Sequence, residues 1–479
     1  MALGKELRRL GKHSVIYGLG GLVSRILAVI LLPLYTRFLT PADYGKVETL
    51  IALTTVIGIV LRMGISSAFF RFYFDSPEPA ARRLVLRTSF WFTMGMATLG
   101  LAVGLALSGE ISQRLFGSSD SSELVMAAFV GLWAGMNYEQ LTSLFRVEER
   151  SVAFVSASLT NILVTVGATL LLVVVLDKGP IGVIVGNFTG TLLVYAILIG
   201  YRREQLGLQF DRHLLREMNR FGIPLVPTAL FLWITNFSDR LFLVHLADTT
   251  EVGLYSVGVR IASALVLLLT AFRLAWPAFA YSIEDDREAK RAYSYVLTYL
   301  LFVCCWLSVA LGVLAPWLVD LLAPKHSFHR AADAVALLAF AATAYAGYTV
   351  VAIGIGRARQ TQFNWIVAGA AAAINIALNI ILIPPYGMIG AAISTVAAYL
   401  ALFLLMVLNS HRVYPVAYQW RRVAILTSVA IGLTVLGSVV DVPLAVAILI
   451  ALSYPLVLLP LRFYLPAERR RLRGLFGSA

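Results

Sequence analysis

Charged side chains are scarce in this sequence: Asp, Glu, Lys and Arg make up 14% of the 479 residues, whereas hydrophobic residues make up 59%. A soluble chain of this length could not bury so much apolar surface, so most of that surface must lie in lipid. The first apolar segment is much longer than the h-region of a signal peptide and lacks a small-residue cleavage site, so we expect no cleavable signal. The composition therefore predicts an all-α integral membrane protein.

Residues suited to catalysis and metal binding are also few. The two cysteines, Cys304 and Cys305, are adjacent in an apolar segment, so they form neither an ordinary disulfide nor a metal site with each other. The six histidines are scattered along the chain. The sequence has no P-loop, no HExxH motif and no nucleotide fingerprint in a strand–helix setting. We expect no catalytic residue, no metal and no cofactor, and hence neither an enzyme nor direct ATP hydrolysis.

Apolar runs of membrane-spanning length predict about 14 transmembrane helices, among them spans near 45–73, 123–145 and 180–201. With the N-terminus in the cytoplasm, most of the 39 Lys and Arg residues fall on the cytoplasmic side, as the positive-inside rule requires. Both termini are then cytoplasmic, and the expected location is the inner (cytoplasmic) cell membrane. A basic face on anionic lipid explains the net charge of +13 without nucleic acid.

The chain contains an internal repeat, in which three short segments recur in the same order. Residues 39–45, 150–154 and 179–182 are matched 208 or 209 residues later by 247–253, 359–363 and 387–390. Each repeat holds six predicted spans, an even number, so both insert the same way up and are related by a pseudo-two-fold axis along the membrane normal. The predicted boundaries are an N-terminal lobe at 1–202, a cytoplasmic amphipathic linker at 203–219, a C-terminal lobe at 220–410, two additional spans at 421–464 and a basic cytoplasmic tail at 465–479.

The linker carries an apolar stripe at helical spacing. Its members are Leu206, Phe210, Leu214, Met218 and Phe221. The stripe predicts a helix that lies in the cytoplasmic membrane interface. A polar connection without that role is the alternative.

Five arginines lie within predicted spans, and four of them are candidates for a common cavity: Arg25, Arg62, Arg240 and Arg260, from the first two spans of each repeat. Arg273 is the fifth, and it lies too far around its helix from Arg260 for both to face one cavity squarely. A guanidinium at bilayer depth is costly unless it faces water, protein or a ligand. Because guanidinium groups bind phosphate and carboxylate bidentately, the four residues predict a cationic cavity for an anionic headgroup. Arg240 follows Asp239, which offers a neutralising partner.

Carboxylates within the spans are fewer still, namely Glu48, Glu139 and Asp239. Each is a candidate for coupling to H⁺ or Na⁺, and a buried ion pair is the alternative, favoured for Asp239. Asn161, Asn187, Asn236, Asn375 and Asn379 could bond sugar hydroxyls, although such residues more often join helices.

Two motifs resemble those of a known family. The residues Ser24, Arg25, Pro33, Arg37, Leu39, Pro41, Tyr44 and Gly45 resemble the opening of the polysaccharide transporter branch of the multidrug/oligosaccharidyl-lipid/polysaccharide exporter superfamily. The segment from Asn379 to Thr395 is similar to the hallmark of that family's second lobe. The resemblance covers residues 10–410.

The resemblance implies a flippase that moves undecaprenyl-diphosphate-linked oligosaccharide, a polysaccharide repeat unit such as that of O-antigen lipopolysaccharide, by alternating access. It places Arg25, Arg62 and Arg260 where related lipid II flippases have cavity arginines, with the looser match at Arg62. By the same analogy the last two spans would hold the lipid tail. The expected partners are this glycan lipid, anionic membrane lipids and H⁺ or Na⁺, for a monomer that could associate with a polysaccharide polymerase.

Three alternatives remain open. A lipid II flippase fits the number of spans. A cation-coupled antiporter of small molecules would need an acidic cavity rather than this excess of arginine. A membrane glycosyltransferase or polymerase would need catalytic carboxylates or a long extracytoplasmic loop, which the sequence does not offer.

Overall fold

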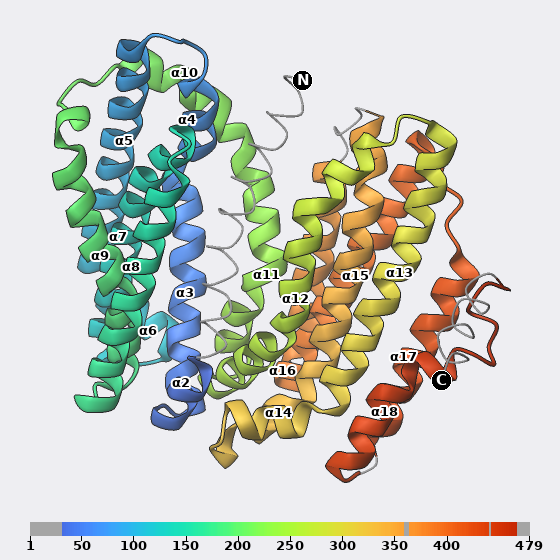
Figure 1. Cartoon of the computed structure of the whole chain (residues 1–479). Coiled ribbons are helices and arrows are strands. Elements are labelled where there is room, and N and C mark those ends of the chain that lie inside the picture. The colour runs from blue at the N-terminus through green and yellow to red at the C-terminus, as the bar shows by residue number, and fades with distance from the viewer. Residues whose placement is uncertain (1–30, 359–363, 440–441, 467–479) are drawn as a thin grey trace. The chain divides into compact units, whose positions relative to one another are not determined.

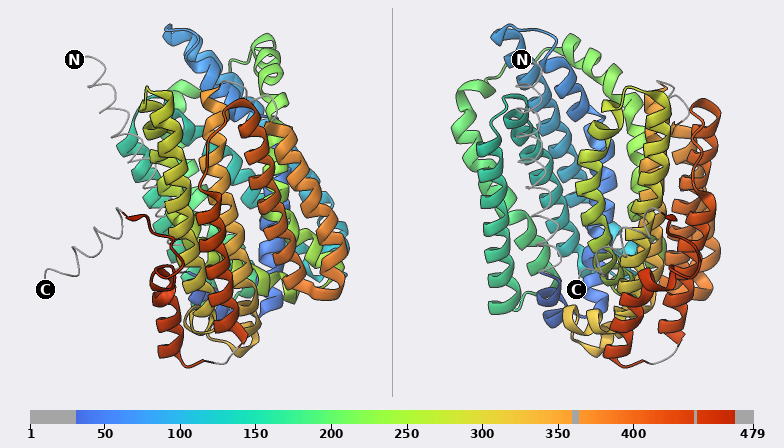
Figure 2. Two further views of the ribbon diagram at one scale, coloured as in Figure 1. Left: turned by 90° about the vertical axis from the view of Figure 1, so that its right-hand side faces the viewer. Right: turned by 45° about the vertical axis from the view of Figure 1, so that its right-hand side comes forward.

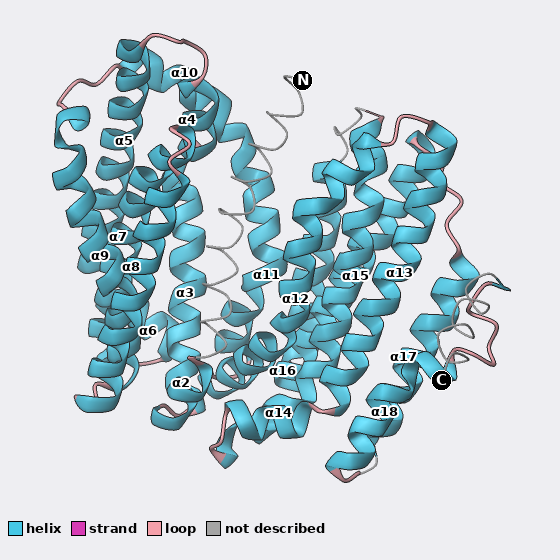
Figure 3. Ribbon diagram, viewed as in Figure 1, coloured by secondary structure: helices cyan, strands magenta, loops and turns pink. Residues whose placement is uncertain are grey.

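The computed structural model describes residues 31–358, 364–439 and 442–466. Within these ranges the chain forms helices joined by short loops, and no strand occurs there (Figure 3). Contacts divide the chain into two compact units. The first unit comprises Met1–Ser256 with Ile383–Gly387, and the second comprises Val257–Leu382 with Met388–Ala479. The prediction of an all-α fold is confirmed.

The helices of each unit follow the apolar segments of the sequence (Figure 1). The first unit holds α2 (Leu32–Phe38), α3 (Pro41–Arg62), α4 (Ile65–Tyr73), α5 (Pro79–Ala106), α6 (Ser108–Phe116), α7 (Ser122–Val147), α8 (Ser151–Leu170), α9 (Gly179–Leu206), α10 (Arg212–Gly222), α11 (Val226–Leu246) and the start of α12 (Thr249–Ser282). The second unit holds the rest of α12 with α13 (Asp286–Val313), α14 (Ala315–Leu322), α15 (Ala332–Arg357), α16 (Asn364–Val413), α17 (Trp420–Val439) and α18 (Leu444–Val457).

Ten helices in the described residues are long and apolar enough to cross a membrane. The chain is therefore a multi-pass membrane protein, as predicted, although the number of fourteen is not confirmed. The 50 residues of α16 contain two predicted spans, since Gly387 breaks the helix with φ 53° and ψ −129°. The predicted lobe boundaries at 202 and 220 stay predictions.

One predicted span, 45–73, is divided in the structure. It ends as α3 at Arg62, and α4 begins at Ile65. Met63 and Gly64 between them have φ values of 47° and 74°, a conformation that only glycine adopts without strain. A side chain at Gly64 would overlap the backbone of Gly222, so the close approach of these two segments requires glycine here.

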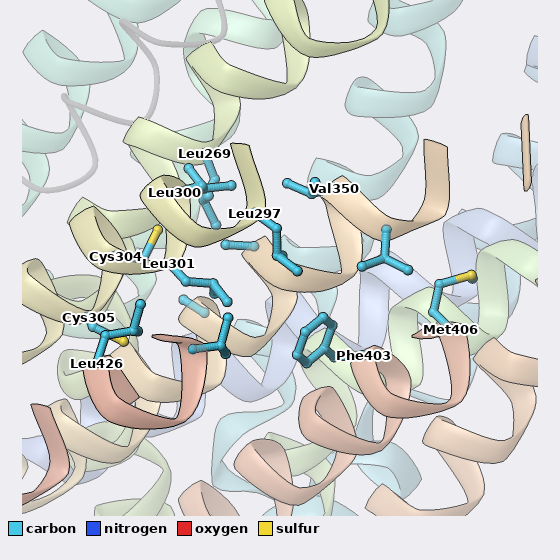
Figure 4. Packing of buried hydrophobic residues seen from close by; sticks show 14 of the residues in the cluster. Leu269, Leu297, Leu300, Leu301, Cys304, Cys305, Val350, Phe403, Met406 and Leu426 are labelled. Carbon is cyan, nitrogen blue, oxygen red and sulfur yellow. The ribbon is translucent and has the colours of Figure 1, made fainter. Parts of the chain in front are cut away.

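The core of the second unit surrounds α13, against which α15 and α17 pack (Figures 1 and 2). Leu297, Leu301, Cys304, Cys305 and Leu426 belong to this core (Figure 4). Both thiols are free and fully buried. They pack among the apolar side chains of this core.

The linker differs from its prediction. The helix α9 continues to Leu206, a loop follows, and the separate helix α10 starts at Arg212, where the Asp211 carboxylate accepts bonds from two backbone N–H groups. Met218 of the predicted stripe is fully buried in the cluster that α4 and α5 form, and Leu214 packs on the same cluster. The linker is therefore not one continuous helix, and protein covers part of its stripe, while its place in the membrane interface stays a prediction.

The internal repeat appears in the structure as a reciprocal contact within the first unit. A methyl group at Gly45 of α3 would overlap the Thr249 carbonyl oxygen, and one at Gly253 of α12 would overlap the Pro41 carbonyl oxygen. Thr249 and Gly253 are the repeat equivalents of Pro41 and Gly45. Gly45 thus contacts Thr249, and its equivalent Gly253 contacts Pro41, which is the equivalent of Thr249. A reciprocal pair of contacts of this kind is expected when two helices are related by a two-fold axis.

Equivalent residues also cap the two helices. Thr40 and Asp43 form a capping box at the start of α3. At the start of α12, the Asp248 carboxylate accepts a bond of 2.8 Å from the Glu251 backbone N–H. Such caps satisfy the free N–H groups of a helix terminus and fix where the helix begins.

Replacing Gly45 by alanine is expected to destabilise the first unit by about 1–3 kcal/mol, because the added methyl group meets backbone that cannot rotate away. Gly95→Ala is the matched control, since nothing lies within 4 Å of a methyl group there. Thermal unfolding in detergent measures both variants. Equal midpoints for the two would show that the Gly45 contact is not tight.

Candidate functional site

The helix α3 places Arg62 at its last position. The capping box and Pro41 at the first turn define the start of α3, and the left-handed Met63 defines its end. A cation at the C-terminus of a helix is favoured by the helix dipole. The local sequence therefore presents a guanidinium at the end of α3, directly before the break between α3 and α4.

Arg62 lines a cavity of about 320 Å³ in the first unit, between α3, α7 and α9. Its polar lining consists of Thr54, Thr55, Asn187, Thr191 and Arg62. Gly58, Gly131 and Gly135 line it as well and leave room that larger side chains would fill. The cavity thus combines one fixed cation with hydroxyl and amide groups, which suits a hydrated anionic or sugar ligand.

Glu139 of α7 is the partner of Arg62. Its carboxylate oxygen Oε2 lies 2.7 Å from Arg62 Nη2, and the two side chains are 27% (Arg62) and 44% (Glu139) exposed. Ion pairs with this much access to solvent contribute about 1 kcal/mol or less. An incoming anion can therefore displace Glu139 from Arg62 at a small cost.

Arg240 of α11 has a different environment. Its Nε lies 3.3 Å from Glu48 Oε2 of α3, and its Nη1 donates a bond of 3.2 Å to the Asn236 carbonyl oxygen. The guanidinium also stacks on the rings of Phe237 and Tyr255 at 5.3 and 5.9 Å. Both members of the ion pair are only 6% exposed, and neither lines the cavity.

Asp239 is held in the same buried layer. Its Oδ2 accepts a bond of 2.6 Å from the Tyr255 hydroxyl, and its side chain is buried. Trp233, two turns earlier on α11, donates a bond of 3.2 Å to the Ala52 carbonyl oxygen of α3. Arg240, Glu48 and Asp239 thus contribute to the packing of α11 with α3 and α12. Their predicted roles in diphosphate binding and ion coupling stay predictions.

The remaining predicted arginines lie elsewhere. Arg260 is half-buried on the part of α12 that belongs to the second unit. Arg25 lies outside the described residues. The structure thus pairs Arg62 with Glu139 and Arg240 with Glu48, and a common cavity for all four arginines stays a prediction.

Some cavity residues were not predicted. Asn187 was a candidate for sugar binding, but Thr54 and Thr55 were not singled out. Thr54, Gly58 and Arg62 follow one another at intervals of four residues, so they lie on one face of α3. That spacing is the signal that could have placed Thr54 beside the arginine.

The fold is that of known membrane transporters. The structure of the lipid II flippase MurJ in an inward closed conformation superimposes with a TM-score of 0.75, covering 92% of this chain and 97% of MurJ at 15% identity. An inward-facing MATE family multidrug resistance transporter of the MOP superfamily superimposes with a TM-score of 0.67 over 82% of this chain and 97% of that chain, at 13% identity. The chain thus has the fold of this superfamily, as the resemblance implied.

The sequence comparisons identify the family. The chain belongs to the family described as polysaccharide biosynthesis protein, whose model matches residues 34–326. It is 25% identical over 413 residues to the lipid III flippase of Escherichia coli, which covers 81% of this chain and 93% of that flippase. These similar proteins are flippases and a transporter, and the prediction that the chain is not an enzyme is confirmed.

Proposed function

We propose that this protein is a flippase that moves undecaprenyl-diphosphate-linked oligosaccharide from the cytoplasmic to the outer leaflet by alternating access. The observation that carries this proposal is the partly exposed Arg62 guanidinium in the wall of a cavity of about 320 Å³ within a membrane helix bundle, where threonine and asparagine side chains accompany it. The family and the similarity to the lipid III flippase support a polysaccharide precursor as the substrate.

The cavity offers the groups that such a substrate needs. A diphosphate removed from water without a counter-charge would cost many kcal/mol, and a fixed guanidinium offsets that cost with short charge-assisted bonds. Thr54, Thr55, Asn187 and Thr191 supply donors and acceptors for sugar hydroxyls or for the water that hydrates them. The polyprenyl tail stays in the lipid, and Arg25 and Arg260 are proposed to contact the same diphosphate at other points of the transport cycle.

Glu139 is proposed to make binding reversible. In the empty cavity its carboxylate holds Arg62, and the arriving diphosphate takes its place. A coupling ion that neutralised Glu139 would favour the diphosphate complex, because the competition for Arg62 would be removed. Glu139 is thus the carboxylate that this geometry favours for ion coupling.

Glu139→Gln is expected to tighten binding of the diphosphate lipid by up to about fivefold, because the competing ion pair is worth about 1 kcal/mol or less. The variant is also expected to bind this lipid with an affinity that does not depend on the coupling ion, H⁺ or Na⁺. Binding isotherms of the purified protein at several pH values and Na⁺ concentrations measure both effects. An ion dependence of the wild-type protein that persists in the variant would exclude Glu139 as the coupling group.

Reconstitution tests the proposal. Liposomes that contain the protein and a defined lipid-linked oligosaccharide are treated with an enzyme that modifies only glycans of the outer leaflet. The protein is expected to expose inner-leaflet glycans that stay protected in protein-free liposomes. No gain in modification would contradict the proposed function.

A lipid II flippase is the second candidate, since the MurJ structure shares the fold over 92% of this chain. The same liposomes loaded with lipid II separate the two candidates. Faster movement of the oligosaccharide lipid supports our proposal, and faster movement of lipid II supports the alternative. The proposal includes a monomer in the inner membrane with both termini in the cytoplasm, able to work beside a polysaccharide polymerase.

A further inference from the structure

A second cavity, distinct from the one that contains Arg62, lies between the two ends of α16 in the second unit. Its volume is about 420 Å³. Five apolar side chains that line it are Ile366, Val367, Ala370, Leu405 and Leu408. The first three come from the start of α16 and the last two from its final turns, so the cavity is a groove between two helical segments that lie side by side.

Large apolar side chains beside the groove are exposed. Trp365 is 58% exposed, Leu404 48% and Leu408 59%. In a multi-pass membrane protein, exposed apolar side chains of this size meet lipid tails, and an exposed tryptophan is typical of the membrane–water interface. The groove therefore opens towards the bilayer, with one end near the headgroups.

The polar end of the groove carries Asn409 and Arg412, three residues apart on one face of α16. Within the described part of the chain, the buried Asn409 Nδ2 group has no hydrogen-bond partner. Arg412 is exposed and forms no ion pair with any described carboxylate. Burying an amide donor without a hydrogen-bond partner costs free energy, so a ligand that supplies an acceptor is favoured at this end of the groove. Because Arg412 lies nearby, an anionic acceptor is favoured most.

The surrounding surface carries charges of both signs. The Tyr414 hydroxyl donates to Asp286 at the start of α13, which places the end of α16 beside the start of α13. Arg287, Arg291 and Arg421 are exposed at this end of the unit, and so are the carboxylates of residues 284–288, so the positive charge of the groove itself comes from Arg412. In the predicted topology this end faces the cytoplasmic leaflet, where anionic lipids concentrate.

We propose that this groove binds an anionic phospholipid. One acyl chain lies between the two segments of α16, and the phosphodiester accepts bonds from Arg412 and from the Asn409 Nδ2 group. The glycerol headgroup of phosphatidylglycerol fits beside Arg412, whereas the ammonium group of phosphatidylethanolamine would be repelled there. The proposal does not depend on the transported substrate.

Lipid titration of the purified full-length protein by native mass spectrometry tests the proposal. Phosphatidylglycerol is expected to bind about tenfold more tightly than phosphatidylethanolamine with the same acyl chains. Arg412→Ala and Asn409→Leu are each expected to remove most of this preference. Ala370→Phe should fill the groove and weaken binding of both lipids, while the control Arg421→Ala, at an exposed arginine that does not line the groove, leaves the preference intact.

Four results would overturn the proposal. Equal binding of the two lipids, or the same effect from Arg412→Ala as from Arg421→Ala, would show that the groove does not select the anionic headgroup. Displacement of phosphatidylglycerol by inorganic phosphate would assign Arg412 to a soluble anion. Tighter binding of undecaprenyl diphosphate than of phosphatidylglycerol, lost in Arg412→Ala, would make the groove an entry site for the transported lipid.

Discussion

Replacing Arg62 by alanine is expected to lower glycan translocation about 100-fold while the protein stays folded in the membrane. Arg62 is the cationic side chain among the described residues that line the cavity. Two charge-assisted bonds from its guanidinium to a diphosphate are worth about 3 kcal/mol or more. Its loss leaves Glu139 without its ion pair, but that carboxylate is 44% exposed and remains hydrated. The effect should therefore fall on transport and not on stability. Leaflet-specific modification of the reconstituted glycan measures it.

The matched control for Arg62→Ala is Arg114→Ala. Arg114 forms an ion pair of 2.8 Å with Glu110 on α6, is 77% exposed and does not line the cavity. This variant should transport at the wild-type rate. Arg62→Lys should recover only part of the activity, because an ammonium group cannot bind phosphate bidentately. Full activity of Arg62→Ala at equal protein levels would remove Arg62 from the mechanism.

Arg240→Ala and Glu48→Ala are each expected to destabilise the protein by about 3–5 kcal/mol, because each removes one half of a buried ion pair. The two side chains connect α11 with α3, and each is only 6% exposed. The expected result is a lower unfolding temperature and less protein in the membrane. Thermal unfolding in detergent and quantification of membrane protein measure the two effects.

The double variant Arg240→Met/Glu48→Leu separates stability from function. Removing both charges together leaves neither half of this ion pair behind, so the stability of the double variant is expected to lie within about 1 kcal/mol of the wild-type value. Near-normal transport by this stable double variant would show that Arg240 and Glu48 serve packing. A stable but inactive double variant would contradict that assignment and support the predicted substrate or ion-coupling roles.

The fold could largely be predicted because long apolar runs in the sequence indicate membrane helices. The predicted span 180–201 lies within α9, and 123–145 lies within α7. The break at Met63 and Gly64 could not be predicted in this way, because the apolar run continues through it. It depends on a tertiary contact with Gly222, far along the chain.

The site was less predictable than the fold, since the sequence shows which charges are in the membrane but not which of them are paired. Glu48 and Arg240 are 192 residues apart in sequence, and only the packing of α3 on α11 shows that they form an ion pair. The burial of the apolar stripe in the linker could not be predicted for the same reason. Its spacing identified an apolar face but not the residues of α4 that cover Met218.

The central claim is that the diphosphate headgroup of a lipid-linked glycan enters the cavity beside Arg62. A photo-crosslinking amino acid at Thr55, which lines this cavity, tests the claim directly in membranes supplied with a radiolabelled lipid-linked oligosaccharide. The label is expected to attach at position 55, to be lost when Arg62 is replaced by alanine, and to be absent from a probe at exposed Leu99 on α5. Labelling at position 55 that persists without Arg62, or equal labelling at both positions, would contradict it.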